Sequence, residues 1–417
     1  MQGSLSEDLA LSQDAKHSNR SSRRTVLLLA IACGVGAANL YYAQPLAASM
    51  ALEFHVAPAR VATTLSLTQL GYAFGMVFLV PLGDGRERRH LIVRTALVAS
   101  LALMFIAAAP TIQWLTAASL LVGFASSIPQ MMIPFAVGLV RPPERPAAVA
   151  VTMSGLLSGI LLSRTVSGIV GGWLGWRATF WGAALVMAAL TAVLRFALPR
   201  QEPEGRPLPY AALLRSMADL VRTEPALRTR TAIGALGFAA FSTFWSTIAF
   251  HLASPGLGYG SATAGLLGAV GIVGVMVAPV VGRFASRLGP TRINRFALAV
   301  AVTAFALFCA AARSLASIVI GVVLLDAGIQ ASHLANQMVI YGLRPEQRNR
   351  LNAVYMVAYF AGGALGTGVG GLAWSLAGWN GVCAAGAGFL LMSFPLLRGN
   401  GHETRSNDEA QRIVGGE

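Results

Sequence analysis

Long stretches without charged residues recur along the whole chain, and this feature constrains the fold more than any other. Hydrophobic residues make up 55% of the 417 residues and charged residues only 12%, whereas a soluble domain carries about 25% charged residues. A helix needs about 20 apolar residues to cross the hydrocarbon core of a bilayer, so each stretch predicts one membrane-spanning helix. We therefore expect an all-α membrane protein whose twelve spanning helices run approximately over residues 25–50, 59–81, 91–109, 113–139, 147–172, 177–198, 231–252, 262–282, 295–312, 315–342, 352–375 and 380–397.

The longest break between these spans divides the chain into two similar parts. Residues 199–230 contain several prolines and mixed charges, so they predict a cytoplasmic linker. The linker would join an N-terminal six-helix bundle at 23–198 to a C-terminal six-helix bundle at 231–397. The polar ends, 1–22 and 398–417, predict disordered cytoplasmic tails, and the first of them lacks the apolar core of a signal peptide.

Basic residues are distributed unevenly around the spans. With the N-terminus in the cytoplasm, all but four of the 31 lysine and arginine residues fall on the cytoplasmic side. Arg60, Arg177 and Arg313 fall outside, and Arg164 falls within a span. Because basic loops face the cytoplasm, we expect both termini there, in a bacterial cytoplasmic membrane. The basic residues behind the net charge of +14 thus indicate how the chain is oriented in a lipid bilayer, and we expect no nucleic-acid partner.

Small residues at helical spacing predict close contacts between helices. Gly362 and Gly366 lie four residues apart, as do Gly155 and Gly159, which suits helix faces that pack in lipid.

Residues 366–371 also contain a G-x-G-x-x-G pattern, but no strand precedes it, so it predicts no dinucleotide site. The three cysteines lie in apolar stretches without metal-type spacing. We expect neither a cofactor nor a metal, and we find no cluster of nucleophile and base typical of an enzyme.

The two halves repeat one another. A shift of 203 positions places Arg141-Pro142 on Arg344-Pro345 and Gly159 on Gly362. Six spans separate the copies, so the repeats have the same orientation in the membrane, as in one large class of transporters.

The loop after the second span carries a family resemblance. Residues 81–89 read PLGDGRERR, and residues 282–289, at the corresponding place in the second half, read GRFASRLG. The first loop resembles the signature of the major facilitator superfamily, G-x-L-A-D-R-x-G-R-R, with Asp84, Arg88 and Arg89 at matching positions. The resemblance implies two six-helix bundles that work by alternating access.

Two further segments resemble a narrower group. Residues 39–46, NLYYAQPL, and residues 328–333, GIQASH, look like the twelve-helix drug:proton antiporter branch, among its metabolite and nucleoside exporter-like members. This likeness implies proton-coupled efflux, with the first, fourth, seventh and tenth spans around a central cavity. We expect the protein to be a monomer. The fifth span departs from the branch, because Ser167-Gly168 stands where the antiporter signature has Gly-Pro.

Three polar residues inside the spans are candidates for proton coupling. Asp326 is the one carboxylate well inside a predicted span, where a charge costs about 2.5–3.5 kcal/mol, so it either binds a proton or makes a structural hydrogen bond. Arg164 either pairs with Asp326 or a substrate, or extends toward the outer interface. His333 lies two helical turns after Asp326 and either relays protons or only makes hydrogen bonds.

Other polar and aromatic residues predict a substrate cavity. Asp326, Gln330, His333 and Gln337 share one helix face, which would line a water-filled space. Aromatic and methionine side chains on the neighbouring spans would suit an apolar or planar substrate, and ordinary packing is the alternative. The predicted cavity residues are Asn39, Tyr42, Gln44, Gln130, Met131, Phe244, Trp245, Gln330, Asn336 and Gln337.

The same loop after the second span predicts a conformational gate. By resemblance, Asp84 helps to close the cytoplasmic side, with Arg88, Arg89 and Arg141 around it. A carboxylate near a guanidinium and a helix terminus is the physical basis. A solvated basic loop is the alternative, and it accounts for the arginines but not for Asp84.

These features together predict a secondary transporter and not an enzyme. Its partners would be a small-molecule substrate, protons and the lipid bilayer. We expect proton-coupled efflux by antiport; an uptake symporter or uniporter of the same fold is the alternative, and a non-transporting membrane sensor is the alternative from another class.

Overall fold

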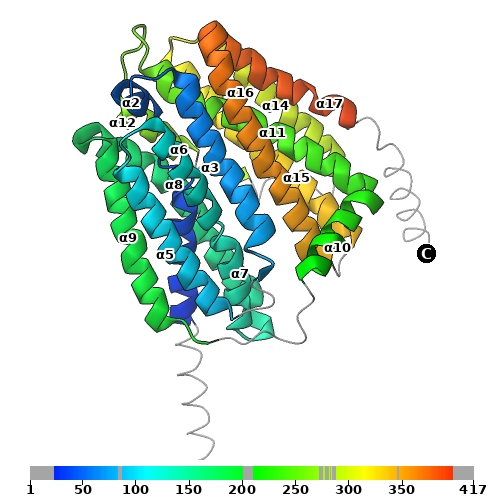
Figure 1. Cartoon of the computed structure of the whole chain (residues 1–417). Coiled ribbons are helices and arrows are strands. Elements are labelled where there is room, and N and C mark those ends of the chain that lie inside the picture. The colour runs from blue at the N-terminus through cyan, green and yellow to red at the C-terminus, as the bar shows by residue number, and fades with distance from the viewer. Residues whose placement is uncertain are drawn as a thin grey trace, which may run out of the picture.

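Every regular element in the described part of the chain is a helix (Figure 1). The computed structural model describes residues 23–82, 87–200, 210–271, 276–277, 281, 283, 288–344 and 347–397. The first helix covers residues 23–38. The others are α2 (Ala47–Glu53), α3 (Pro58–Phe78), α5 (Arg88–Ala107), α6 (Ile112–Ala125), α7 (Pro129–Gly138), η1 (Pro142–Glu144), α8 (Arg145–Leu174), α9 (Trp176–Ala197), α10 (Tyr210–Thr223), α11 (Pro225–Leu252), α12 (Ser261–Val270), α14 (Pro290–Ala310), α15 (Leu315–Leu343), α16 (Arg348–Leu391) and α17 (Ser393–Leu396).

Nine helices among the described residues are long and apolar enough to cross a membrane. The chain is therefore a multi-pass membrane protein, whereas the number twelve remains a prediction. The difference has three local causes. The first helix is short, much of the 262–282 window lies outside the described residues, and α16 contains two of the predicted spans.

The window at 25–50, which we predicted to be one span, is interrupted in the structure. The first helix ends at residue 38, and residues 39–46 form turns before α2 begins. Pro45 has no backbone N–H and its ring collides with the preceding turn, so a straight helix cannot continue through it. The 113–139 window is also divided, between α6 and α7, just before Pro129.

Turns occur where the sequence predicts short loops between spans. Ala377 and Gly378 leave helical geometry inside α16, and Gly378 has a positive φ of 58°. Gly175 separates α8 from α9 at a φ of 83°. Glycine tolerates this left-handed region because it lacks a Cβ atom.

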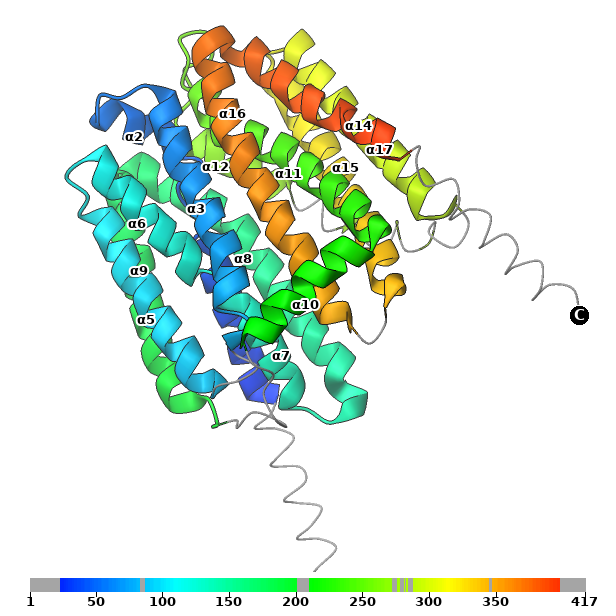
Figure 2. The ribbon, with the colours of Figure 1, turned by 45° about the vertical axis from the view of Figure 1, so that its right-hand side comes forward.

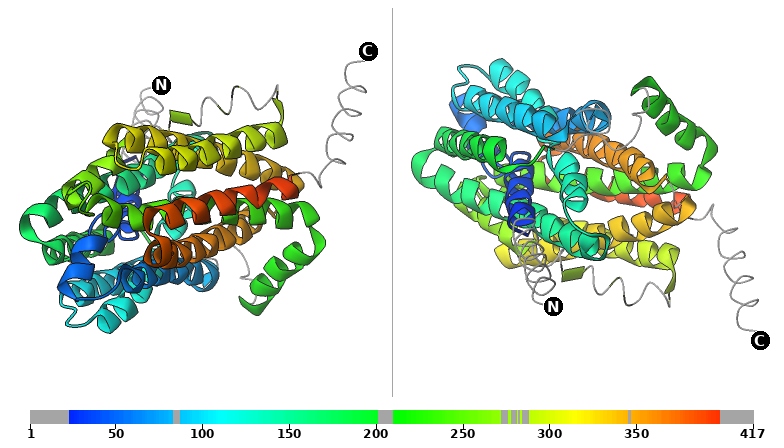
Figure 3. Two further views of the ribbon diagram at one scale, coloured as in Figure 1. Left: turned by 90° about the horizontal axis from the view of Figure 1, so that it is seen from above. Right: turned by 90° about the horizontal axis from the view of Figure 1, so that it is seen from below.

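Two helix pairs join the part of the chain before residue 201 to the part after residue 209. α3 packs along α16, and α8 packs along α12 (Figures 1 and 2). α10 lies at the edge of the bundle in the views from above and below (Figure 3). The Tyr210 hydroxyl, at the start of α10, donates to the Phe78 carbonyl at 3.4 Å.

The predicted glycine contacts between helices are confirmed. A Cβ atom on Gly155 or Gly159 would collide with the backbone of Ala30 or Gly34 in the first helix. On α16, Gly362 and Gly366 face the backbone of α11 in the same way. Backbones can approach this closely only where the side chain is absent.

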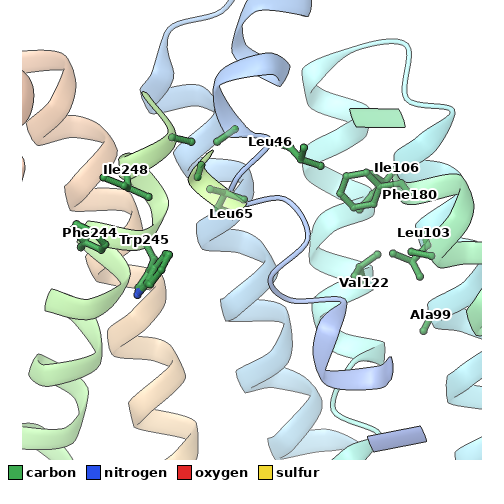
Figure 4. Close-up of a cluster of buried hydrophobic side chains, with 14 of the residues drawn as sticks. Leu46, Leu65, Ala99, Leu103, Ile106, Val122, Phe180, Phe244, Trp245 and Ile248 are labelled. Atoms are coloured by element: carbon green, nitrogen blue, oxygen red, sulfur yellow. The ribbon is translucent and has the colours of Figure 1, made fainter. Parts of the chain in front are cut away.

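The core consists of apolar side chains packed between helices, and further apolar side chains cover the outside. Leu103, Ile106 and Phe180 pack together in the first half, while Phe244 lies in the second (Figure 4). On α9, Leu185, Val186 and Phe196 are exposed, as suits helices that face lipid tails rather than water.

Candidate functional site

Arg164 is a buried cation in the second half of α8. Its side chain is only 2% exposed, so it does not extend to the surface of the protein. Its Nε donates a hydrogen bond to Oε1 of Gln44 at 2.8 Å, and its Nη2 is buried without a hydrogen-bond partner. Gln44 belongs to the turns at residues 39–46, which interrupt the first predicted span. This interruption brings a polar side chain to the cation.

Three aromatic rings surround the guanidinium. Its carbon lies 4.2 Å from the ring centroid of Trp245, 4.7 Å from that of Tyr41 and 5.7 Å from that of Phe241. Ring faces carry negative electrostatic potential, so each contact stabilises the buried charge. Trp245 and Phe241 come from α11, across the contact between the two parts of the chain.

Trp245 also reaches the buried carboxylate. Its indole N–H donates to Oδ1 of Asp326 on α15 at 3.3 Å, and Asp326 is 7% exposed. No ion pair joins Arg164 to Asp326 in this structure, although both side chains are described. The two charges are therefore connected through Trp245 and not by direct contact.

Two glycines of the α12 region leave room for these charges. A Cβ atom on Gly268 would lie 2.6 Å from the Arg164 side chain, and one on Gly271 would lie 2.5 Å from Oδ2 of Asp326. A larger residue at Gly268 would displace the aliphatic stem of Arg164, and one at Gly271 would displace the Asp326 carboxylate. Nothing in the sequence singled these glycines out, because their role depends on which helix packs beside them.

The polar face predicted on α15 meets several different neighbours. His333 Nδ1 shares a hydrogen bond of 2.9 Å with the Tyr355 hydroxyl of α16, and Gln337 donates to Asn352 at 3.4 Å. Gln330 is half-buried. Among the described residues of this predicted face, Asp326 is the one that forms a hydrogen bond with Trp245.

Asn336 and Phe244 both make contacts with α14. Asn336 is fully buried and accepts a hydrogen bond of 2.6 Å from Asn294 of α14. Phe244 stacks on Phe308 of α14 at 4.4 Å, and it projects from α11 on a different side from Trp245 (Figure 4). For both residues, these contacts agree with ordinary packing, which was the alternative to a place in the substrate cavity.

The remaining predicted cavity residues lie on the first half. Gln130 donates to the Tyr72 hydroxyl at 3.1 Å, and Met131 is buried. Tyr42 is half-buried, and its neighbour Tyr41 is the one that meets Arg164. Asn39 is buried, and neither of its side-chain polar atoms has a hydrogen-bond partner.

A polar contact between α3, α11 and α16 was not predicted. Gln69 donates to the Thr367 hydroxyl at 3.0 Å and accepts from the Ser242 hydroxyl at 3.4 Å. A carboxamide within an apolar span is the signal that could have identified Gln69. Thr367 also lies 203 positions after Arg164, so the internal repeat places both at the contact between the halves.

The gate residues are only partly described. Asp84 lies outside the described residues, and Arg88 is half-buried at the start of α5. Arg89 donates to the Arg195 carbonyl at the end of α9, and Arg141 is exposed. Arg344, the repeat counterpart of Arg141, pairs with Glu224 at 2.6 Å.

The described residues bring together no group of three His, Cys, Asp or Glu side chains that could hold a metal ion. The chemistry of this site is therefore that of one cation, one carboxylate and several aromatic rings. Apolar helices that bury such a site between them are typical of a membrane transporter.

Known proteins place the chain in a family. The model of the Major Facilitator Superfamily matches residues 26–341, and the chain belongs to this superfamily of transporters. It is similar to an uncharacterized transporter, YgaY of Escherichia coli O157:H7, with 38% identity over 91% of this chain and 96% of the relative. It is also similar to the probable transporter SCO4007 of Streptomyces coelicolor, with 35% identity over 90% of this chain and 87% of the relative.

A solved structure shares the fold. A bacterial homolog of the human lysosomal transporter Spinster, in an inward-facing and unoccupied conformation, superposes with a TM-score of 0.70 and 15% sequence identity. The match covers 91% of this chain and 94% of the other.

Proposed function

We propose that the protein moves a small organic molecule across the bacterial cytoplasmic membrane by alternating access, with proton coupling at Asp326. The bundles at 23–198 and 231–397 would contribute six spans each, joined by the cytoplasmic linker at 199–230. The protein would act as a monomer with both termini in the cytoplasm. The observation that carries the proposal is the contact series from Arg164 through Trp245 to Asp326, which runs from one bundle to the other.

This contact series is suited to coupling because it depends on the relative position of the bundles. Arg164 belongs to the first bundle, and Trp245 and Asp326 belong to the second. A rocking motion would change the distance between the guanidinium and the indole. A proton or substrate that binds more tightly in one arrangement would therefore shift the balance between the two.

The contacts between the bundles support one end being closed. Ser66 donates to the Ala364 carbonyl at 2.6 Å, and Thr165 donates to the Gly265 carbonyl at 3.1 Å. Thr165 lies in the last third of α8, and Ser66 lies just before the middle of α3. A contact nearer the end of α8 is the hydrogen bond from the Ser261 hydroxyl to the Gly168 carbonyl at 3.2 Å. In the proposed topology α3 begins and α8 ends on the outer side, so these contacts would close the site toward the outside.

Two coupling schemes use a proton at Asp326. The resemblance to drug:proton antiporters favours efflux by antiport, which is the first candidate. Symport is the second candidate, and one observation favours it: no carboxylate of the described residues lies at ion-pair distance from Arg164, so Arg164 can hold an anion while a proton occupies Asp326.

Proteoliposomes with an imposed pH gradient test the proposal. The labelled substrates would come from a binding screen of the purified protein. An acidic interior drives uptake by antiport, and an alkaline interior drives uptake by symport. We expect Asp326→Asn to bind substrate but to lose gradient-driven flux by about tenfold or more, because the amide cannot exchange a proton.

Asp219→Asn is the matched control, because Asp219 is an exposed carboxylate on α10. It should keep full gradient-driven flux. Among the described residues, Arg164 and Tyr359 are ionisable groups that interact with Asp326, so the pH dependence of flux would also be measured in variants of these two. Unchanged gradient-driven flux in Asp326→Asn would contradict proton coupling at this residue.

A further inference from the structure

The guanidinium of Arg164 is a buried cation that forms no ion pair with any residue that the structure describes. Its one hydrogen bond within the described part of the chain goes to the neutral carboxamide of Gln44. The nearby carboxylate, Asp326, instead accepts from Trp245. Nη2 of Arg164 is buried and has no partner.

This arrangement is costly unless something else binds there. Buried charges in proteins are normally paired and hydrogen-bonded, because removing a charge from water is expensive. The aromatic rings offset part of this cost, but they accept no strong hydrogen bond from Nη2. An anionic group is the ligand that satisfies both the charge and the free donor, and guanidinium groups bind carboxylates well.

We infer that Arg164 binds the anionic group of the transported molecule, and that this molecule is a small organic carboxylate with a flat apolar body. The rings of Tyr41, Phe241 and Trp245 around the guanidinium supply the surface for that body. Gln44 holds Nε and so leaves Nη2 for the ligand. The inference rests on the proposed function, because it takes this site as the transport site.

The charges of the site then determine how protons and substrate combine. Arg164, ionised Asp326 and a bound carboxylate together carry one negative charge. A proton on Asp326 brings the sum to zero, which is the favourable state in apolar surroundings. The acid and the proton would therefore cross in the same direction, which favours the symport candidate.

Thermal unfolding of the purified protein tests the inference with defined probes. The panel contains acetate, benzoate and indole-3-acetate, the matching amide of each, and inorganic phosphate. We expect the aromatic acids to raise the unfolding temperature and their amides to have little effect. Equal stabilisation by acids and amides, or no response to any acid, would overturn the inference, and a response to phosphate alone would mean an inorganic anion site.

Substitutions connect the response to Arg164. Arg164→Gln should abolish the response to the acids, while Arg313→Gln, which changes an exposed arginine outside the site, should keep it. Gln44→Glu provides a variant that is expected to fold, because it places a carboxylate beside the buried guanidinium. It should unfold at a higher temperature without ligand and lose the response to acids. A full acid response in Gln44→Glu would overturn the inference.

Flux measurements separate this inference from the proposed function. Acids that bind in an Arg164-dependent way but do not cross the liposome membrane would contradict transport and leave the anion site intact. Proton-coupled flux of neutral or cationic molecules, with no binding of acids, would overturn the anion site and leave transport intact.

Discussion

Trp245 connects the two buried charges of the site by two different interactions. The face of its ring lies against the Arg164 guanidinium, and its indole N–H donates to Asp326. The same residue can therefore respond both to a change at the carboxylate and to a displacement of the first bundle. Its neighbour Phe244 packs against Phe308 instead, so adjacent positions on α11 have separate roles.

Trp245→Phe separates these two interactions. Phenylalanine keeps an aromatic face for Arg164 but has no N–H for Asp326. A hydrogen bond of this kind contributes about 0.6–1.5 kcal/mol, so we expect gradient-driven flux to fall about threefold to tenfold, with substrate affinity nearly unchanged. Flux in proteoliposomes and binding to purified protein are the two measurements.

Trp114→Phe is the control for the loss of an indole donor. Trp114 donates to the Phe105 carbonyl at 3.0 Å, away from the charged site. An equal loss of flux in both variants would show that the Trp245 donor has no particular part in coupling.

At the scale of helices, the interruption of a predicted span and the close helix contacts at glycines determine where the residues of the site lie. The interruption at residues 39–46 places Tyr41 and Gln44 beside Arg164. Turns at membrane depth leave backbone groups that must find partners, and they are tolerated where other protein segments cover them. Glycines at the crossing of α11 with α16 set how closely these helices approach, and therefore where Trp245 lies.

Gly366→Leu tests one such crossing. The added side chain would meet the backbone of Ala239, so we expect a loss of about 1–3 kcal/mol in stability or a failure to fold. Gly388→Leu is the matched control on α16, because a Cβ atom there meets nothing within 4 Å. Thermal unfolding in detergent compares the two, and similar behaviour of both variants would contradict the role of the close contact.

At the scale of the whole molecule, the contact between α3 and α16 joins the two parts of the chain. Ser66 lies on this contact, and a Cβ atom on Gly368 would lie 3.8 Å from its hydroxyl. In the proposed mechanism this contact must open during each transport cycle. A permanent link between the two helices should therefore hold the protein in one arrangement.

The double variant Ser66→Cys and Gly368→Cys tests this expectation. Cys33, Cys309 and Cys383 would first be replaced by alanine, because all three are free thiols. We expect oxidation to form a disulfide and to stop transport, and reduction to restore it. The two single-cysteine variants control for oxidation itself, and full transport by the cross-linked protein would contradict alternating access at this contact.

Local sequence signals predicted much of the fold and part of the site. The turn at Gly175 lies between the spans predicted at 147–172 and 177–198. The glycine contacts at Gly159 and Gly362 follow the predicted spacing of four residues. Arg164 and Asp326 were recognisable because charges are rare in apolar spans. Gly268 and Gly271 were not, because their importance comes from the charged groups that face them.

The sequence by itself determined that this chain is a helical membrane transporter of the major facilitator superfamily. Apolar length, charge placement and the loop at 81–89 carry that information, because the cost of burying charge in lipid acts on each segment separately. Only the tertiary structure decided which groups meet. Arg164 and Asp326 lie 162 positions apart, on α8 and α15, and they are joined through Trp245 and not paired directly. That outcome depends on how α8, α11 and α12 pack, since helix packing decides the distance between side chains from different helices.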